Sequence, residues 1–167
     1  MTDKIVCESL EGAIKRQHAG EQFDFIISIG DTQDPRDHVD GNGRVFSFAF
    51  EDTLASKGAL NAPTFETFQA LRRLLENVWA GTNKSLLVHC QGGVSRSSAT
   101  TLLALVIEFE DTCSARTIVA ELFKINPFAL PHEDFLQWID SEFDFGGWLV
   151  ELVEEKTKEV MNNKFTI

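Results

Sequence analysis

The chain has 167 residues, of which 43% are hydrophobic, and its 15 basic and 26 acidic residues give a formal net charge of -11. A chain of this size and apolar content can bury one hydrophobic core, so we expect a single domain over residues 1–167. The negative charge repels nucleic-acid phosphates and anionic lipid, which argues against nucleic-acid or membrane binding. A local pocket built from one arginine and backbone amides could still hold a phosphate.

The cysteines give little support for a disulfide framework or a zinc site. Cys7, Cys90 and Cys113 are widely spaced, form no Cys-x-x-Cys pair and have no histidine pair at metal-ligand spacing. We therefore expect no metal and no cofactor. The first residues lack the apolar segment of a signal peptide, and no apolar run is long enough to span a membrane. We expect a soluble cytoplasmic protein with reduced thiols.

The first half of the chain alternates between helical and strand patterns. Residues 8–18 predict a helix and residues 23–30 a mostly buried strand, so a helix is expected first. Residues 31–43 form a polar loop, whose acidic residues allow calcium binding but lack the EF-hand pattern. A short strand is expected at 44–50, followed by an amphipathic helix at 64–80 that Thr64 would cap.

The second half continues this alternation. We expect a strand at 85–89 and helices at 96–110, 114–124 and 132–143. Together these elements predict an α/β fold with a central, mainly parallel sheet of four or five strands flanked by helices. A last helix is expected from about Trp148, in a tail at 147–167 that could be appended to the domain. Its apolar stripe favours packing on the domain, and partner binding is the alternative. The stripe consists of Trp148, Leu149, Leu152 and Val153.

The segment from His89 to Ser97 reads His-Cys-Gln-Gly-Gly-Val-Ser-Arg-Ser and lies between a predicted strand and a predicted helix. Backbone N–H groups in a loop at a helix N-terminus bind anions, and an arginine such as Arg96 can donate to two phosphate oxygens. This positive cradle favours the thiolate of Cys90, which could attack phosphorus and form a phosphocysteine. The residues expected to bind the phosphate are Gln91, Gly92, Gly93, Val94, Ser95 and Arg96.

The same segment resembles the His-Cys-x-x-Gly-x-x-Arg-Ser signature of protein tyrosine and dual-specificity phosphatases, and Val-Ser-Arg-Ser is similar to the dual-specificity branch. The resemblance implies a phosphatase in which Ser97 assists departure of the cysteine sulfur and His89 orients the phosphate loop. It covers residues 23–143 and is weak outside the loop, where Asn126 and His132 depart from the family pattern. The competing interpretation is a buried Cys90 beside a glycine turn, with Arg96 paired to surface carboxylates.

The leaving group also needs a proton from a carboxylic acid. In the family this acid lies on a loop after an upstream strand, and Asp52, 38 positions before Cys90, occupies such a place. The following Thr53 is also similar to the family. Glu51 remains the alternative, because local chemistry does not separate the two carboxylates.

The resemblance implies a phosphorylated protein as the substrate, with phosphotyrosine and also phosphoserine or phosphothreonine accepted, and we expect a monomer. Gln91 and Val94 stand where phosphoinositide phosphatases of this superfamily carry lysines, which disfavours inositol lipid. Three alternatives remain. They are an RNA 5′-phosphatase, which the net charge disfavours, a catalytically silent phosphate-binding module, and a sulfurtransferase, which Ser95, Arg96 and Ser97 disfavour.

Overall fold

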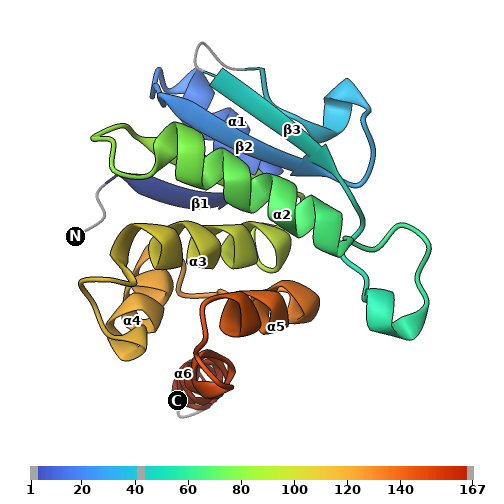
Figure 1. The fold of residues 1–167 in the computed structure, drawn as a ribbon. Helices are drawn as coiled ribbons and strands as arrows, with labels where there is room; N and C mark the ends of the chain where they lie inside the picture. The colour runs from blue at the N-terminus through green and yellow to red at the C-terminus, as the bar shows by residue number, and fades with distance from the viewer. Residues whose placement is uncertain (1–3, 41–43, 165–167) are drawn as a thin grey trace.

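The computed structural model describes residues 4–40 and 44–164. The predicted loop at 31–43 and the predicted tail at 147–167 each include residues outside this part, namely 41–43 and 165–167. Within the described residues, four strands and six α-helices form an α/β fold (Figure 1). The predicted fold class is confirmed. None of the described helices is long and apolar enough to cross a bilayer.

The sheet is parallel throughout, with the strand order β1-β4-β2-β3. Its register pairs Ser9 with Cys90 and Ser28 with His89, so the carboxyl ends of β1, β2 and β4 lie side by side. In open parallel sheets, ligands bind at this edge. The strands are β1 (Ile5–Ser9), β2 (Phe25–Gly30), β3 (Arg44–Ala49) and β4 (Leu86–Cys90).

Both faces of the central strands are buried, which explains their continuous apolar runs. All six residues of β2 are buried. Ile27 and Ile29 join the main core together with Val88 of β4, whereas Ile26 and Leu87 belong to a smaller cluster beneath the first helix. The sheet therefore needs helices on both sides.

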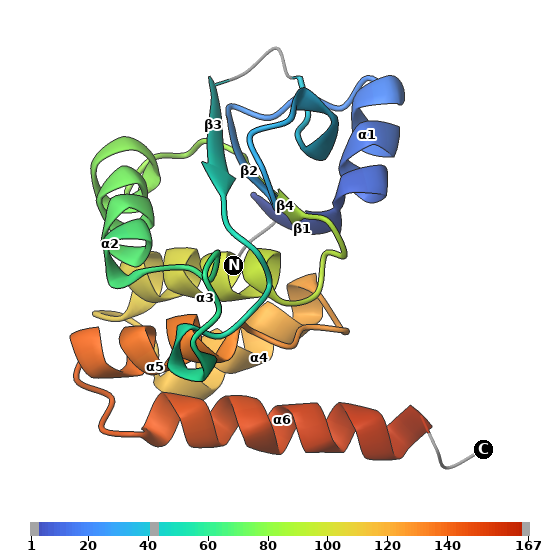
Figure 2. The ribbon, with the colours of Figure 1, turned by 90° about the vertical axis from the view of Figure 1, so that its right-hand side faces the viewer.

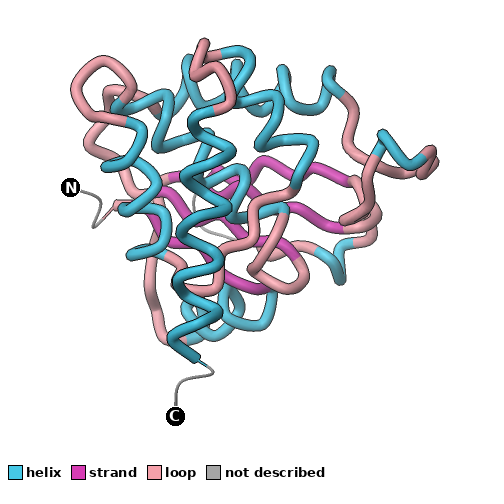
Figure 3. The backbone as a smooth tube through the Cα atoms, turned by 90° about the horizontal axis from the view of Figure 1, so that it is seen from below, coloured by secondary structure: helices cyan, strands magenta, loops and turns pink. Residues whose placement is uncertain are grey.

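The helices are distributed unequally over the two faces of the sheet. The α1 helix lies alone on one face, and the others lie on the opposite side (Figure 2). The α6 helix packs on α4 and α5 away from the sheet and is nearest the viewer in Figure 3. The helices are α1 (Leu10–His18), α2 (Phe65–Leu74), α3 (Arg96–Phe109), α4 (Ala115–Ile125), α5 (Glu133–Glu142) and α6 (Trp148–Lys164).

The apolar stripe of α6 packs on the domain, as predicted. Leu149, Leu152 and Val153 are buried in the main core, whereas Trp148 is 49% exposed. The buried carboxylate of Asp140, in α5, accepts hydrogen bonds from three backbone N–H groups at the start of α6, which have no partner within a helix. The donors are Gly147 N at 2.6 Å, Leu149 N at 2.9 Å and Val150 N at 3.2 Å.

The helix predicted at 64–80 is interrupted before its end. Thr64 caps α2 as predicted, since its Oγ1 accepts a hydrogen bond from Thr67 N at 3.2 Å. The α-helical geometry ends at Leu74, and Leu75–Trp79 continue as a π-helical turn. Gly81 follows with a φ of 68°, a conformation that favours glycine and turns the chain toward β4.

The prediction that a helix comes first was wrong, because β1 precedes it. This strand has only five residues and pairs along one side with β4. Its last residue, Ser9, is also the cap of α1 and accepts a hydrogen bond from Gly12 N at 3.0 Å. No loop separates the strand from the helix, so the two patterns merge in the sequence.

Candidate active site

The predicted strand, loop and helix around the phosphate loop are confirmed, since residues 91–95 join the end of β4 to the start of α3. Gly93 has a φ of 69°, and a Cβ there would lie 2.6 Å from the backbone carbon of Glu8. Apart from its two chain neighbours, no atom of the described residues lies within 4 Å of a Cβ built on Gly92. A side chain would therefore clash with the protein at Gly93, where the loop contacts β1, but not at Gly92.

Cys90 lies at the base of this loop and is 2% exposed. Gly93 N donates to its sulfur at 3.3 Å, and the sulfur lies 3.2 Å from Ser97 Oγ. When the sulfur carries a negative charge, the Ser97 hydroxyl becomes the donor of this second contact. The two residues expected to act on the same sulfur atom are thus brought together.

Arg96 is held by its Nη1 atom, which donates to Asp31 Oδ1 at 2.5 Å and to Phe50 O at 2.7 Å. The arginine side chain is 4% exposed, whereas that of Asp31 is 53% exposed. The Arg96 Nε atom is buried and has no hydrogen-bond partner among the described residues. A buried N–H without a partner is costly, so this atom fits a binding role toward an anion.

The structure brings Asp52 to the phosphate loop. Ser95 Oγ donates to Asp52 Oδ1 at 2.6 Å, across 43 positions in the sequence. Glu51 is engaged elsewhere, because its Oε1 atom accepts from Asn61 Nδ2 at 2.9 Å and its backbone N donates to Asn61 O at 2.8 Å. Within the described residues, Asp52 is thus the candidate acid that is hydrogen-bonded to the loop, and Glu51 is not.

A second loop, between α4 and α5, supports the phosphate loop from outside. Asn126 Nδ2 donates to Gly93 O at 2.7 Å, and Leu130 N donates to Val94 O at 3.0 Å. In the sequence, Asn126 stands out only as a departure from the family pattern. That departure was the available signal, because the Asn126 amide holds the loop at Gly93, whose φ is positive.

His132, the other residue that departs from the family pattern, is buried, with 3% of its surface exposed. Its Nε2 atom forms a hydrogen bond with Thr53 O at 2.8 Å. Nearby, Ala55 N donates to Asp134 Oδ2 at 2.9 Å. These contacts fix the segment that carries Asp52 to the start of α5.

His89 is completely buried beside Cys90. Burial lowers the pKa of His89 from its ordinary value of 6.5 to about 4, and it outweighs an interaction with the Cys90 backbone that acts in the opposite direction. Neither ring nitrogen makes a well-aligned hydrogen bond within the described residues. The ring is therefore neutral near pH 7, and its role in orienting the loop stays a prediction.

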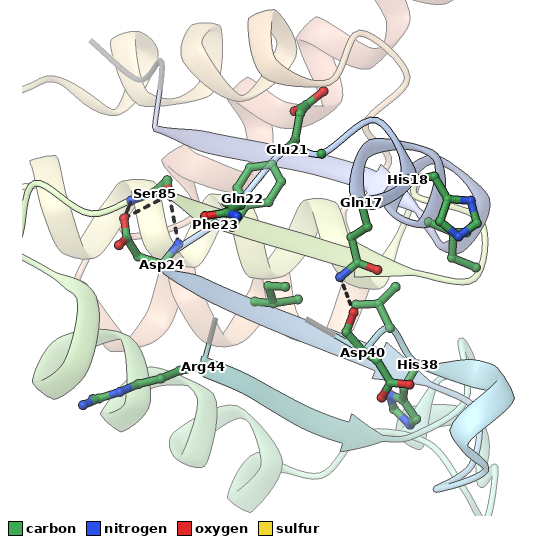
Figure 4. A pocket seen from close by; sticks show the side chains of 14 residues that line it. Gln17, His18, Glu21, Gln22, Phe23, Asp24, His38, Asp40, Arg44 and Ser85 are labelled. Carbon is green, nitrogen blue, oxygen red and sulfur yellow. Dashed lines mark hydrogen bonds between the residues drawn. The ribbon is translucent and has the colours of Figure 1, made fainter. Parts of the chain in front are cut away.

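A cavity of about 870 Å³ lies away from the phosphate loop, on the α1 side of the sheet (Figure 4). Gln17 and His18 of α1 line it together with Asp40 and Arg44, which flank residues 41–43 outside the described part. Within the described residues, no group of three or more histidine, cysteine or acidic side chains could hold a metal ion. The chemistry-bearing groups converge at the phosphate loop instead.

The similarity of this chain to known proteins lies in its fold. No protein-family model matches the sequence, and no curated protein matches it significantly. Solved structures do match. Human DUSP28 is 16% identical over 86% of this chain and 90% of its own, with a TM-score of 0.58. The Yvh1 phosphatase domain from Chaetomium thermophilum is 17% identical over 89% and 95%, with a TM-score of 0.56.

A third similar structure is the human tyrosine phosphatase-like serine/threonine/tyrosine-interacting protein, 15% identical over 83% of this chain and 86% of its own, with a TM-score of 0.55. Identities this low establish the fold alone. The chain has the fold of the dual-specificity phosphatases, and the resemblance predicted from the loop residues is confirmed at that level.

Proposed function

We propose that the chain is a cysteine-dependent phosphatase acting on phosphorylated proteins, with phosphotyrosine and also phosphoserine or phosphothreonine as substrates. One observation carries the proposal. The Cys90 sulfur lies beside the Ser97 hydroxyl at the N-terminus of α3, where Arg96 has a buried Nε atom without a partner among the described residues, and Asp52 is hydrogen-bonded to the same loop. A nucleophile, an anion cradle and an acid are the parts that such hydrolysis requires.

Substrate binding would place the phosphate within the loop of residues 91–95. Its oxygens would accept hydrogen bonds from the loop N–H groups and from Arg96 Nε, which has no other partner among the described residues. The positive end of the α3 dipole adds to this attraction. Because Asp31 and Phe50 O already hold the guanidinium, little side-chain ordering is left for the binding step.

In the first chemical step, the Cys90 thiolate attacks phosphorus and the bond to the leaving oxygen breaks. Asp52 donates its proton to that oxygen, which departs as a tyrosine, serine or threonine hydroxyl. In the second step, Asp52 accepts a proton from water as the water oxygen attacks the phosphocysteine. The sulfur–phosphorus bond breaks, inorganic phosphate is released, and the Ser97 hydroxyl donates to the departing thiolate.

The first test is hydrolysis of para-nitrophenyl phosphate with EDTA present, comparing the wild type, Cys90→Ser and Cys113→Ser. We expect the wild type and the Cys113 variant to be active, because Cys113 lies outside the phosphate loop, and Cys90→Ser to be inactive. Substantial turnover by Cys90→Ser would overturn the nucleophile assignment. An inactive wild type that still binds vanadate would favour the silent phosphate-binding module.

Several further features belong to this proposal. We propose that residues 1–167 act as one domain and that the protein works in the cytoplasm as a monomer, without nucleic acid. The net charge of -11 supports a protein substrate over an RNA end. Phosphate release without thiosulfate activity would separate the phosphatase from a sulfurtransferase.

A further inference from the structure

An apolar groove begins at the phosphate loop itself. Val94 of the loop forms one wall, and Pro127, Phe128 and Leu130 of the α4–α5 loop form the next. The far wall is the carboxyl-terminal end of α6, with Met161. Because Leu130 N is hydrogen-bonded to Val94 O at 3.0 Å, this groove and the catalytic loop are parts of one fixed surface.

The exposure of the lining residues distinguishes this groove from ordinary surface. Phe128 is 60% exposed, Leu130 45% and Met161 47%, and they make up half of the six large exposed hydrophobic residues in the described part of the chain. Such gathering of exposed apolar side chains marks a binding surface, whereas scattered ones do not. The residues that line the groove carry no charged side chain, so burial there favours an apolar group over a charged one.

The size of the groove indicates what occupies it. Its volume of about 240 Å³ is below the roughly 300–1,000 Å³ of typical small-molecule sites. It is therefore suited to a side chain of a bound peptide. An extended peptide advances roughly 3.3 Å per residue, so a residue one to three positions from the phosphorylated one reaches a groove that starts at the loop.

We propose that this groove is a specificity site that receives a large apolar side chain of the substrate, one to three residues from the phosphorylated residue. This inference rests on the proposed phosphatase function and adds the sequence context of the substrate. Phe128, Leu130 and Met161 are its specificity-determining residues, and they take no part in the chemical steps.

The test uses a set of neutral phosphotyrosine peptides in which each of the three positions on either side carries alanine, leucine or phenylalanine in turn. We expect leucine or phenylalanine at one position to raise kcat/KM about tenfold over alanine, as differences in one apolar side chain typically do. Phe128→Ser and Met161→Gln should reduce this preference and leave hydrolysis of para-nitrophenyl phosphate unchanged. Trp148→Gln, at the other end of α6, is the matched control and should keep the preference.

The outcomes separate the two proposals. No hydrolysis of para-nitrophenyl phosphate by the wild type would remove the phosphatase function itself. Normal hydrolysis with equal kcat/KM for all peptides would overturn the specificity site alone. A wild type that sediments as a dimer, becomes monomeric in Phe128→Ser and shows no peptide preference would assign the groove to a second copy of the chain, which also overturns the proposal.

Discussion

Because His89 is buried, the protein should become less stable as the pH is lowered from neutral. Its pKa is about 4 in the folded protein because of burial, against 6.5 in the unfolded chain. Between these values the unfolded state binds more protons, so stability is fully present above pH 6.5 and is lost as the pH falls toward 4. The linkage relation gives a loss from this group of about 1.3 kcal/mol between about pH 7.5 and about pH 5.5.

Urea unfolding of the wild type, His89→Asn and His18→Asn at the two pH values would measure this effect. His89→Asn should lose about 1.3 kcal/mol less stability than the wild type over this interval, whatever its stability at neutral pH. His18→Asn is the control, since His18 is exposed, and should follow the wild type. If His89→Asn has the same pH dependence as the wild type, the buried neutral ring is refuted.

Three further predictions concern carboxylates. Asp52→Asn should lower kcat on phenyl phosphate by about a hundredfold or more, and Glu51→Gln should not; a larger loss with Glu51→Gln would move the general acid there. Asp140→Ala should destabilise the protein by about 2 kcal/mol in urea unfolding, because it leaves N–H groups at the start of α6 unpaired, including the buried one of Leu149. An equal effect of Glu151→Ala, in the same turn, would contradict this. Asp31→Asn should lower kcat/KM about tenfold by loosening the phosphate-binding arginine, and unchanged kinetics would rule out a positioning role.

The parts of the fold that the sequence predicted are those that depend on local pattern. The buried run of β2 and the amphipathic face of α2 are both long enough to be read from spacing alone. The short β1 strand was missed because its five residues run directly into the cap of α1. The π-helical turn at Leu75–Trp79 buries Leu75 and Trp79, which are four positions apart as in an ordinary α-helix, so the apolar spacing does not reveal it.

The residues of the candidate site are also of two kinds: some lie close together in the sequence, and others are brought to them only by the fold. Cys90, Gly93, Arg96 and Ser97 lie within one short segment, and their chemistry follows from the strand, loop and helix that this segment joins. Asp52 was identified only through resemblance, since its contact with the loop spans 43 positions.

Asp31 shows why the rest of the site could not be read from the sequence. It lies 65 positions from Arg96, and the two residues meet because β2 is the neighbour of β4 in the sheet. The spacing of apolar residues predicts strands but not their order, and only the order places the end of β2 beside the phosphate loop. Asn126 likewise reaches Gly93 across 33 positions. Both residues act on groups that the motif supplies, so their expected effect is on the geometry of the loop: we expect variants at either position to weaken catalysis while Cys90 stays in place.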